Sequence, residues 1–183
     1  QSSAKCLRSL EQGKIEAALV VKSETEDFGE DFIPVSYLED IFVGTKTYIE
    51  NLKKRIGAPD ADTATLLENA NLMLLDEENV SRVFVDNYFS RNGIEVNKCL
   101  EVTNMDLLIE FAKIGMGIAC VIRDVAVEEL KKGSIVELKL EMPMNRRTVG
   151  FVFSKENLAL HAVEKFRKWV LDNKERIAKE RNI

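Results

Sequence analysis

Two predicted helix starts carry the residues with the clearest capacity to bind a ligand. Thr103 and Asn104 follow a strand-like segment and open a helical one, and Asn79 and Ser81 stand at the start of another. The first turn of a helix offers unpaired N–H groups and a partial positive charge, to which hydroxyl and amide side chains add donors, so it can hold an anion. The alternative is plain capping: Thr103 to Asp106 fits a capping box in which Thr103 accepts from the third helical N–H.

Three further places are weaker candidates for ligand contact. Lys22 and Ser23 follow the apolar run Ile15–Val21, where a parallel sheet would place a ligand-binding loop, although an ordinary solvated loop is the alternative. Thr45 begins a helical segment beside an extended one. Gly117 could admit a ligand to its backbone, but we expect it chiefly to let the next strand pack closely.

Two neighbouring residues are expected to serve the fold. Arg82 could pair with an acidic ligand, but Asp86 lies four residues later, which favours a salt bridge on the helix surface. Gly115 is expected to end a helix, since a left-handed residue is least costly for glycine.

Neither catalytic nor metal chemistry is indicated. Cys6, Cys99 and Cys120 are odd in number and widely spaced, which is typical of small buried residues in a reducing compartment. Cys99 could be a redox sensor, but its apolar neighbours favour a structural thiol. The single histidine, His161, has no evident nucleophile to activate and is expected at the surface. We predict a cytoplasmic protein that is not an enzyme and has no cofactor or metal.

Whole-chain numbers exclude several further classes. The net charge of −5 and the pI near 5.2 argue against a nucleic-acid-binding surface in this segment, because phosphate contacts need clustered Lys and Arg. The longest apolar stretches are far shorter than the roughly 20 residues of a membrane span. No segment resembles a signal peptide.

The elements that must position these residues alternate between strand and helix. We predict helices at 4–12, 45–57, 63–69, 79–91, 103–114, 124–132 and 158–178, and strands within 15–21, 32–43, 72–75, 95–102, 118–122, 135–140 and 149–153. This alternation predicts an α/β fold with a mostly parallel sheet, whose ligand lies at the carboxyl ends of the strands.

The first strand carries two expectations of its own. The run Ile15–Val21 is almost continuously apolar, which is typical of a strand buried on both faces of a parallel sheet. A helix over 4–12 that leads directly into such a strand implies an earlier strand. We therefore expect the sequence to be truncated at its N-terminus.

A set of stretches in order along the chain resembles the effector-binding domain of LysR-type transcriptional regulators. No stretch is specific alone, but together they cover nearly the whole chain; they are Leu7–Val20, Leu74–Arg82, Phe89–Gly93, Glu101–Ile122, Glu129–Val136 and Ser154–Val170. The resemblance implies a two-lobed fold like the type 2 periplasmic binding proteins. Each lobe would be a mostly parallel sheet flanked by helices, joined to the other by two crossover strands, near Ile41–Gly44 and Val149–Val152.

The same resemblance implies a domain division and a function. Lobe I would comprise residues 1–42 and 151–183, without its first strand and helix, and lobe II residues 43–150. A small anionic effector would bind between the lobes and modulate DNA binding by an absent winged helix-turn-helix. The full-length regulator would be a homodimer or tetramer, without membrane contact.

Departures from the family pattern and rival functions remain. Thr45-Lys46 replaces a usual apolar–proline pair, with a longer helical insert up to Gly57, and Ile122-Arg123 replaces an expected proline. The cleft loops are therefore expected to differ from those of relatives. A solute-binding protein of a transporter would share the fold, although it would be exported, which the three cysteines fit less well. An enzyme on a related fold would need a catalytic group that is not evident.

Overall fold

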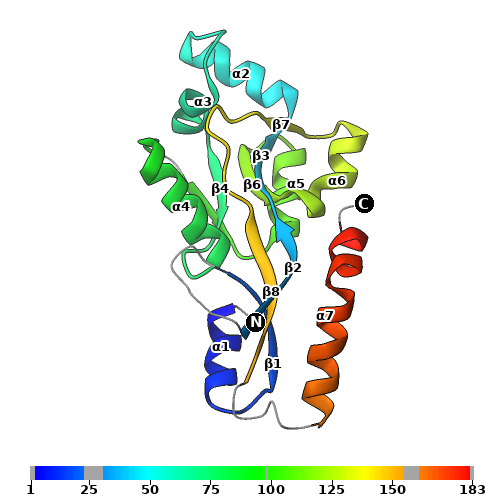
Figure 1. Ribbon diagram of the computed structural model, residues 1–183. Helices are drawn as coiled ribbons and strands as arrows, with labels where there is room; N and C mark the ends of the chain where they lie inside the picture. Colours follow the sequence, from blue (N-terminus) through cyan, green and yellow to red (C-terminus); the bar gives the residue numbers. More distant parts are fainter. Residues whose placement is uncertain (1–2, 23–30, 98, 155–160, 182–183) are drawn as a thin grey trace. The chain divides into compact units, whose positions relative to one another are not determined.

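The computed structural model of the protein describes residues 3–22, 31–97, 99–154 and 161–181 (Figure 1). The helices are α1 Ser3–Glu11, α2 Lys46–Ile56, α3 Thr63–Asn69, α4 Val80–Asn92, α5 Met105–Lys113, α6 Arg123–Lys132 and α7 His161–Arg181. The strands are β1 Ala17–Val21, β2 Phe32–Leu38, β3 Asp40–Gly44, β4 Leu72–Leu75, β5 Cys99–Val102, β6 Ile118–Ile122, β7 Val136–Leu138 and β8 Arg147–Phe153. The predicted α/β class is confirmed.

The chain divides into two compact units. Unit 1 comprises Gln1–Leu38 with Arg146–Ile183, and unit 2 comprises Glu39–Asn145. The chain therefore passes between units at 38/39 and 145/146, a few residues before the lobe boundaries expected from the sequence. No helix in the described part of the chain is long and apolar enough to cross a membrane.

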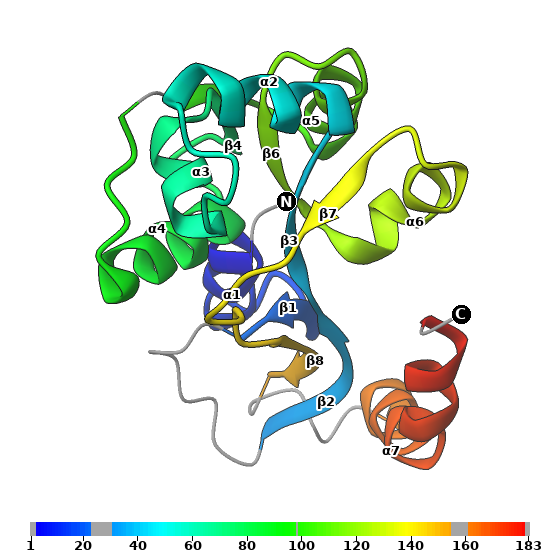
Figure 2. The same cartoon turned by 90° about the horizontal axis from the view of Figure 1, so that it is seen from above.

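Unit 2 is built on a five-stranded sheet in the order β5-β4-β6-β3-β7. Strand β4 pairs in parallel with both β5 and β6, whereas β3 is antiparallel to β6 and β7. Helices α2, α3 and α4 cover one face, and α5 and α6 cover the other (Figure 2). Because both faces are covered, successive strand residues are buried on alternate sides, which explains the continuously apolar sequence of β4 and β6.

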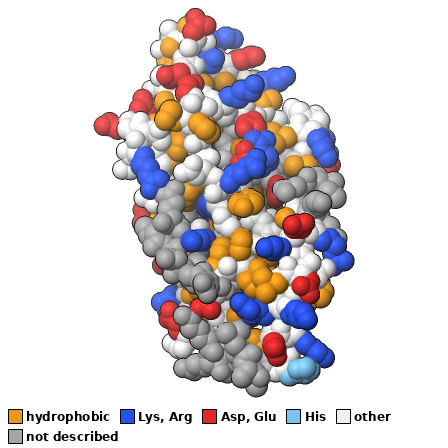
Figure 3. All heavy atoms as spheres, viewed as in Figure 1, with side chains coloured by type: hydrophobic (Ala, Val, Ile, Leu, Met, Phe, Trp, Pro, Cys, Tyr) orange, Lys and Arg blue, Asp and Glu red, His pale blue; other side chains and the backbone are white. Residues whose placement is uncertain are grey.

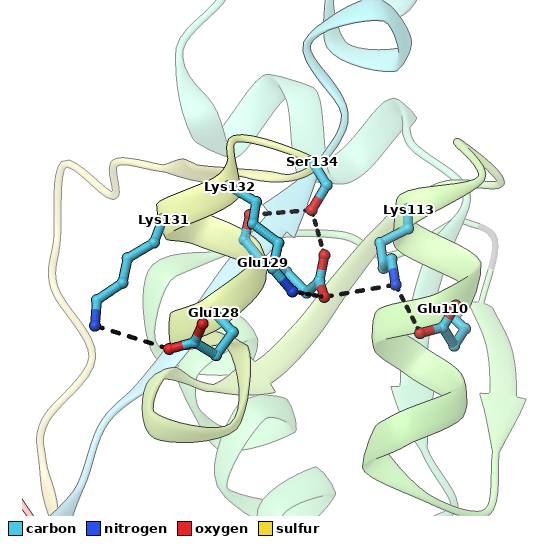
Figure 4. A network of polar contacts seen from close by, with 7 residues as sticks. All are labelled: Glu110, Lys113, Glu128, Glu129, Lys131, Lys132 and Ser134. Atoms are coloured by element: carbon cyan, nitrogen blue, oxygen red, sulfur yellow. Dashed lines mark hydrogen bonds and ion pairs between the residues drawn. The ribbon is translucent and has the colours of Figure 1, made fainter.

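Polar contacts join the two helices on the second face. Lys113 at the end of α5 pairs with Glu110 at 2.8 Å and with Glu129 of α6 at 3.6 Å (Figure 4). Glu129 also accepts from the Ser134 hydroxyl, and Lys132 lies 3.3 Å from the same carboxylate. These bonds hold the pKa of Glu129 below its ordinary value, with the Ser134 hydroxyl as the largest cause.

The connection from unit 2 back to unit 1 is anchored on the first face. The Tyr88 hydroxyl donates to the Met142 carbonyl at 2.8 Å, and the Thr63 hydroxyl donates to the Lys139 carbonyl at 2.5 Å. The backbone N–H of Thr63 also donates to the Glu141 carboxylate at 3.1 Å. Two backbone carbonyls of the irregular segment after β7, those of Lys139 and Met142, thus have hydrogen-bond donors within unit 2.

Unit 1 differs from the mostly parallel arrangement that was predicted for it. Its described strands lie in the order β1-β8-β2, and both pairs are antiparallel. Helix α1 packs with Ala18 and Val20 on one face, and α7 packs on the other. The expectation that β1 is buried on both faces is also wrong, because Leu19 is 44% exposed. A strand at the edge of an antiparallel sheet can keep alternate side chains in solvent.

Candidate functional site

Three helices of unit 2 begin at the same edge of its sheet. Strands β4, β5 and β6 run parallel, with Leu75 level with Val102 in the β4–β5 pair. Helices α4, α5 and α6 follow these strands along the chain. The carboxyl edge of unit 2, by which we mean the ends of β4, β5 and β6 and the starts of these helices, is therefore the place where a parallel sheet presents its loops to a ligand.

The start of α5 leaves a hydroxyl available. Asn104, and not Thr103, is the N-cap: its side-chain oxygen accepts from the Leu107 N–H at 2.9 Å. The predicted capping box with Thr103 is therefore wrong, because Asn104 takes the extended backbone conformation that places its own oxygen over the first turn. Thr103 is exposed, and its side chain has no hydrogen bond to a described residue. The hydroxyl of Thr103 can thus serve a ligand.

The start of α4 is capped by Asn79, whose side-chain oxygen accepts from the Ser81 N–H at 3.0 Å. The first turn of α4 contains no acidic residue, whereas Asp106 lies in the first turn of α5 and Asp124 in that of α6. Carboxylates in a first turn offset the positive end of a helix. The α4 start therefore has no carboxylate within its first turn, although Asp76, Glu77 and Glu78 come directly before its cap.

Arg82 is held by protein groups at this edge. It pairs with Asp86 at 2.9 Å, as predicted, and also with Glu101 of β5 at 3.1 Å, while its Nη1 donates to the Leu75 carbonyl at 3.0 Å. Its side chain is only 11% exposed, so it is not the exposed helix residue that was expected. Burial lowers the pKa of Arg82, but the hydrogen bonds of Asp86 and Glu101 outweigh that effect and raise it. Arg82 therefore ties β4, β5 and α4 together.

A second arginine at the edge was missed by sequence reasoning. Arg123 opens α6, where no side chain caps the helix. Its guanidinium lies 3.1 Å from Glu39 and 2.6 Å from Glu137, and these partners, Glu137 first, raise the pKa of Arg123. The one available signal was the arginine in place of the family's proline after β6.

Two of the predicted ligand residues lie at the opposite, amino edge of the same sheet. Thr45 caps α2 by accepting from the Tyr48 N–H at 3.1 Å. Gly117 precedes β6, and a Cβ added there would lie 2.1 Å from the Asn71 carbonyl oxygen, so its predicted packing role is confirmed. Beside Thr45 is a hollow of about 340 Å³, lined by Thr45, Thr47, Tyr48, Asn51, Lys113, Ile114 and Gly115. The structure therefore does not bring Thr45 and Gly117 together with Thr103 or Asn79.

The remaining predicted contacts belong to unit 1. Lys22 follows β1, where its N–H donates to the Thr148 carbonyl at 2.8 Å and its ammonium lies 5.7 Å from the centre of the Phe32 ring. That position allows a cation–π interaction, so the ammonium already has a partner within its own unit. Ser23 lies outside the described residues.

The candidates for other chemistry have ordinary surroundings. Cys99 is exposed in β5 rather than buried as predicted, yet partial burial of its thiol raises its pKa, with Arg82 as the main opposing influence. A raised thiol pKa disfavours the reactive thiolate. His161 is exposed at the start of α7, as predicted. On the face shown in Figure 3, basic, acidic and hydrophobic side chains are interspersed.

Comparison with solved structures gives the same fold repeatedly. The effector binding domain of QuiR in complex with shikimate matches with a TM-score of 0.70 and 16% identity, over 96% of this chain and 79% of that one. The apo regulatory domain of HypT from Salmonella typhimurium matches with a TM-score of 0.71 and 13% identity, over 96% and 80%. The CcmR regulatory domain of Synechocystis PCC6803 in complex with 2-PG matches with a TM-score of 0.70 and 12% identity, over 94% of this chain and 79% of that one.

Comparison at the level of sequence supplies the family. A search of curated proteins matches none. The family described as LysR substrate binding domain, in contrast, matches residues 1–175. Since this match spans nearly all of the 183 residues, and the solved domains share the fold, the chain belongs to the LysR substrate binding domain family.

Proposed function

We propose that the protein senses a small anionic effector at the carboxyl edge of unit 2. The observation that carries the proposal is the meeting of three helix starts at that edge, beside an exposed Thr103 hydroxyl that has no hydrogen bond to any residue that the structure describes. Asn104 and the α4 start, with Asn79 and Ser81, supply further N–H and side-chain donors. QuiR and CcmR, whose domains share the fold, were solved with the small molecules shikimate and 2-PG.

The wider setting follows from the family. We propose that units 1 and 2 correspond to the two lobes that the family resemblance implies. Effector binding then alters DNA binding by a winged helix-turn-helix in a homodimeric or tetrameric cytoplasmic regulator, and the domain itself catalyses no reaction. Family membership favours this function over the transporter alternative considered from the sequence. Thr45 and Gly117, at the amino edge, are left out of the proposed site.

The test begins with a ligand screen. Thermal shift and calorimetry against small carboxylates, amino acids and inorganic anions should identify at least one compound that stabilises the domain, since a ligand of the native state raises its stability. The best compound is then titrated against Thr103→Val, which removes the hydroxyl and keeps the shape. Loss of one hydrogen bond to a charged group should weaken binding by about tenfold.

Thr47→Val is the matched control. Thr47 is also an exposed threonine of unit 2, but it lies on α2 beside the amino-edge hollow. The proposal requires that Thr47→Val binds like the unmodified protein. No stabilisation by any compound would contradict the sensing function, and weaker binding in Thr47→Val alone would move the site to the amino edge.

A further inference from the structure

Arg123 stands where the chain enters unit 2. Glu39 is the first residue of that unit, between the end of β2 at Leu38 and the start of β3 at Asp40. Arg123 is the first residue of α6 and belongs to the carboxyl edge of unit 2. The start of α6, at Arg123, therefore lies next to the boundary of unit 2, at Glu39.

The contact between them involves both main chain and side chain. In the β3–β6 ladder, Asp40 is level with Ile122, and one step beyond this pair the Arg123 N–H donates to the Glu39 carbonyl at 2.9 Å. The guanidinium approaches the Glu39 carboxylate at 3.1 Å through Nε, with a second, longer contact of 3.4 Å through Nη2. Glu39 is thus held to the start of α6 by one main-chain hydrogen bond and by one ion pair between side chains.

The guanidinium of Arg123 also binds strand β7. Nη2 of Arg123 donates to the Glu137 carboxylate of β7 at 2.6 Å. One planar cation with several N–H donors can serve two carboxylates in this way, whereas removal of its charge would leave two anions facing each other. The position of Glu39 therefore depends on the charge of Arg123.

We propose that Arg123 is a positioning residue of the sensor, which fixes the chain crossing at Glu39 to the carboxyl edge that binds the effector. A change in angle between the units is then taken up on the unit 1 side of Glu39, and a displacement of α6 by a ligand is passed directly to the crossing. The inference rests on the proposed function for the identity of the ligand edge. Its test uses the ligand-free protein, so that the two can fail separately.

The variants are Arg123→Gln, Glu39→Gln and Glu137→Gln, with Lys113→Gln as the control. Lys113 also lies between two carboxylates, those of Glu110 and Glu129, but it joins α5 to α6 away from the crossing (Figure 4). Two measurements are made on each variant. The first is hydrogen exchange of the residue 123 amide, which remains present in Arg123→Gln. The second is the width of the distance distribution between spin labels at exposed Glu11 in unit 1 and exposed Lys54 in unit 2, attached through unnatural amino acids.

The proposal expects Arg123→Gln and Glu39→Gln to raise the exchange rate of the residue 123 amide by about fivefold, because a partly exposed ion pair shifts the equilibrium between the closed and open states of a strand end by about that factor. Both variants should also broaden the distance distribution. Glu137→Gln, which keeps the Arg123–Glu39 pair, should change the distribution less, and Lys113→Gln should leave both measurements unchanged. An unaltered distribution in both Arg123→Gln and Glu39→Gln would overturn the proposal. So would equal broadening in Lys113→Gln, since the effect would then be a general loss of stability in unit 2.

Discussion

Replacement of Gly117 by alanine tests the closest approach in unit 2. The added Cβ would lie 2.1 Å from the Asn71 carbonyl oxygen, and the nearest atoms are backbone, so no side chain can rotate away. A tolerable contact requires the two segments to separate by roughly 1 Å. The same Asn71 oxygen accepts the Ile118 N–H at 3.0 Å, at the point where β4 and β6 begin to pair. The separation therefore breaks a hydrogen bond and disturbs that pairing.

The magnitude follows from these two effects. Overpacking costs about 1–3 kcal/mol, and loss of the Asn71–Ile118 bond adds about 1 kcal/mol, so the free energy of unfolding should fall by about 2–4 kcal/mol. At about 2–4 °C per kcal/mol for a protein of this size, Tm should fall by about 5–15 °C. Urea titration followed by circular dichroism gives the free energy, and differential scanning calorimetry gives Tm.

Gly44→Ala is the control for this experiment. Gly44 lies opposite in the neighbouring strand, where a Cβ would be 3.4 Å from the Gly117 carbonyl oxygen and 3.6 Å from an Ile118 side-chain carbon. These are ordinary contacts, so the free energy should change by less than about 1 kcal/mol. The reasoning is refuted if Gly117→Ala unfolds like the unmodified protein, or if Gly44→Ala is destabilised to the same extent.

Three further predictions concern charged and reactive side chains. Arg82→Met should lower the free energy of unfolding by about 2 kcal/mol in urea titration, since it leaves Glu101 and a strand carbonyl without their donor; a loss below about 0.5 kcal/mol would contradict this. Because burial raises the pKa of Cys99, its alkylation by iodoacetamide at pH 7.5 should be slower than that of a free thiol, with Cys99→Ser identifying the modified site; faster alkylation would show an activated thiol. Ser134→Ala should raise the pKa of Glu129 towards its ordinary value. Because the pKa of Glu129 is lowered in the folded protein, its ionised carboxylate stabilises the fold at any pH above the ordinary glutamate pKa. This stabilisation is lost as the pH falls through the lowered pKa. The difference in Tm between the two proteins should therefore shrink on acidification rather than grow.

Local sequence signals were sufficient for the elements and for much of the candidate site. The predicted α3 and β4 coincide with the observed Thr63–Asn69 and Leu72–Leu75, and β6 coincides with Ile118–Ile122. Helix caps, turn glycines and apolar runs act within a few residues, so they can be read without tertiary contacts. The placement of Asn79, Ser81, Thr103 and Asn104 at helix starts rests on such signals.

Pairing and side-chain partners needed the tertiary structure. Nothing local in Ile15–Val21 tells that β8 lies beside β1, which makes the sheet of unit 1 antiparallel and leaves Leu19 exposed. Nor does a local pattern show that Thr45 lies at the edge opposite Thr103, since strand direction decides which loops meet.

The sequence by itself thus determined the α/β class, the family resemblance and the helix starts that carry the ligand donors. The tertiary structure decided which of those starts share one edge and which side chains are already engaged there. Arg82 and Arg123 show the difference: besides any nearer partner, each pairs with a carboxylate 14 or more residues away, that of Glu101 for Arg82 and that of Glu137 for Arg123. Such contacts depend on strand order and register, which a periodicity of two or 3.6 residues does not encode.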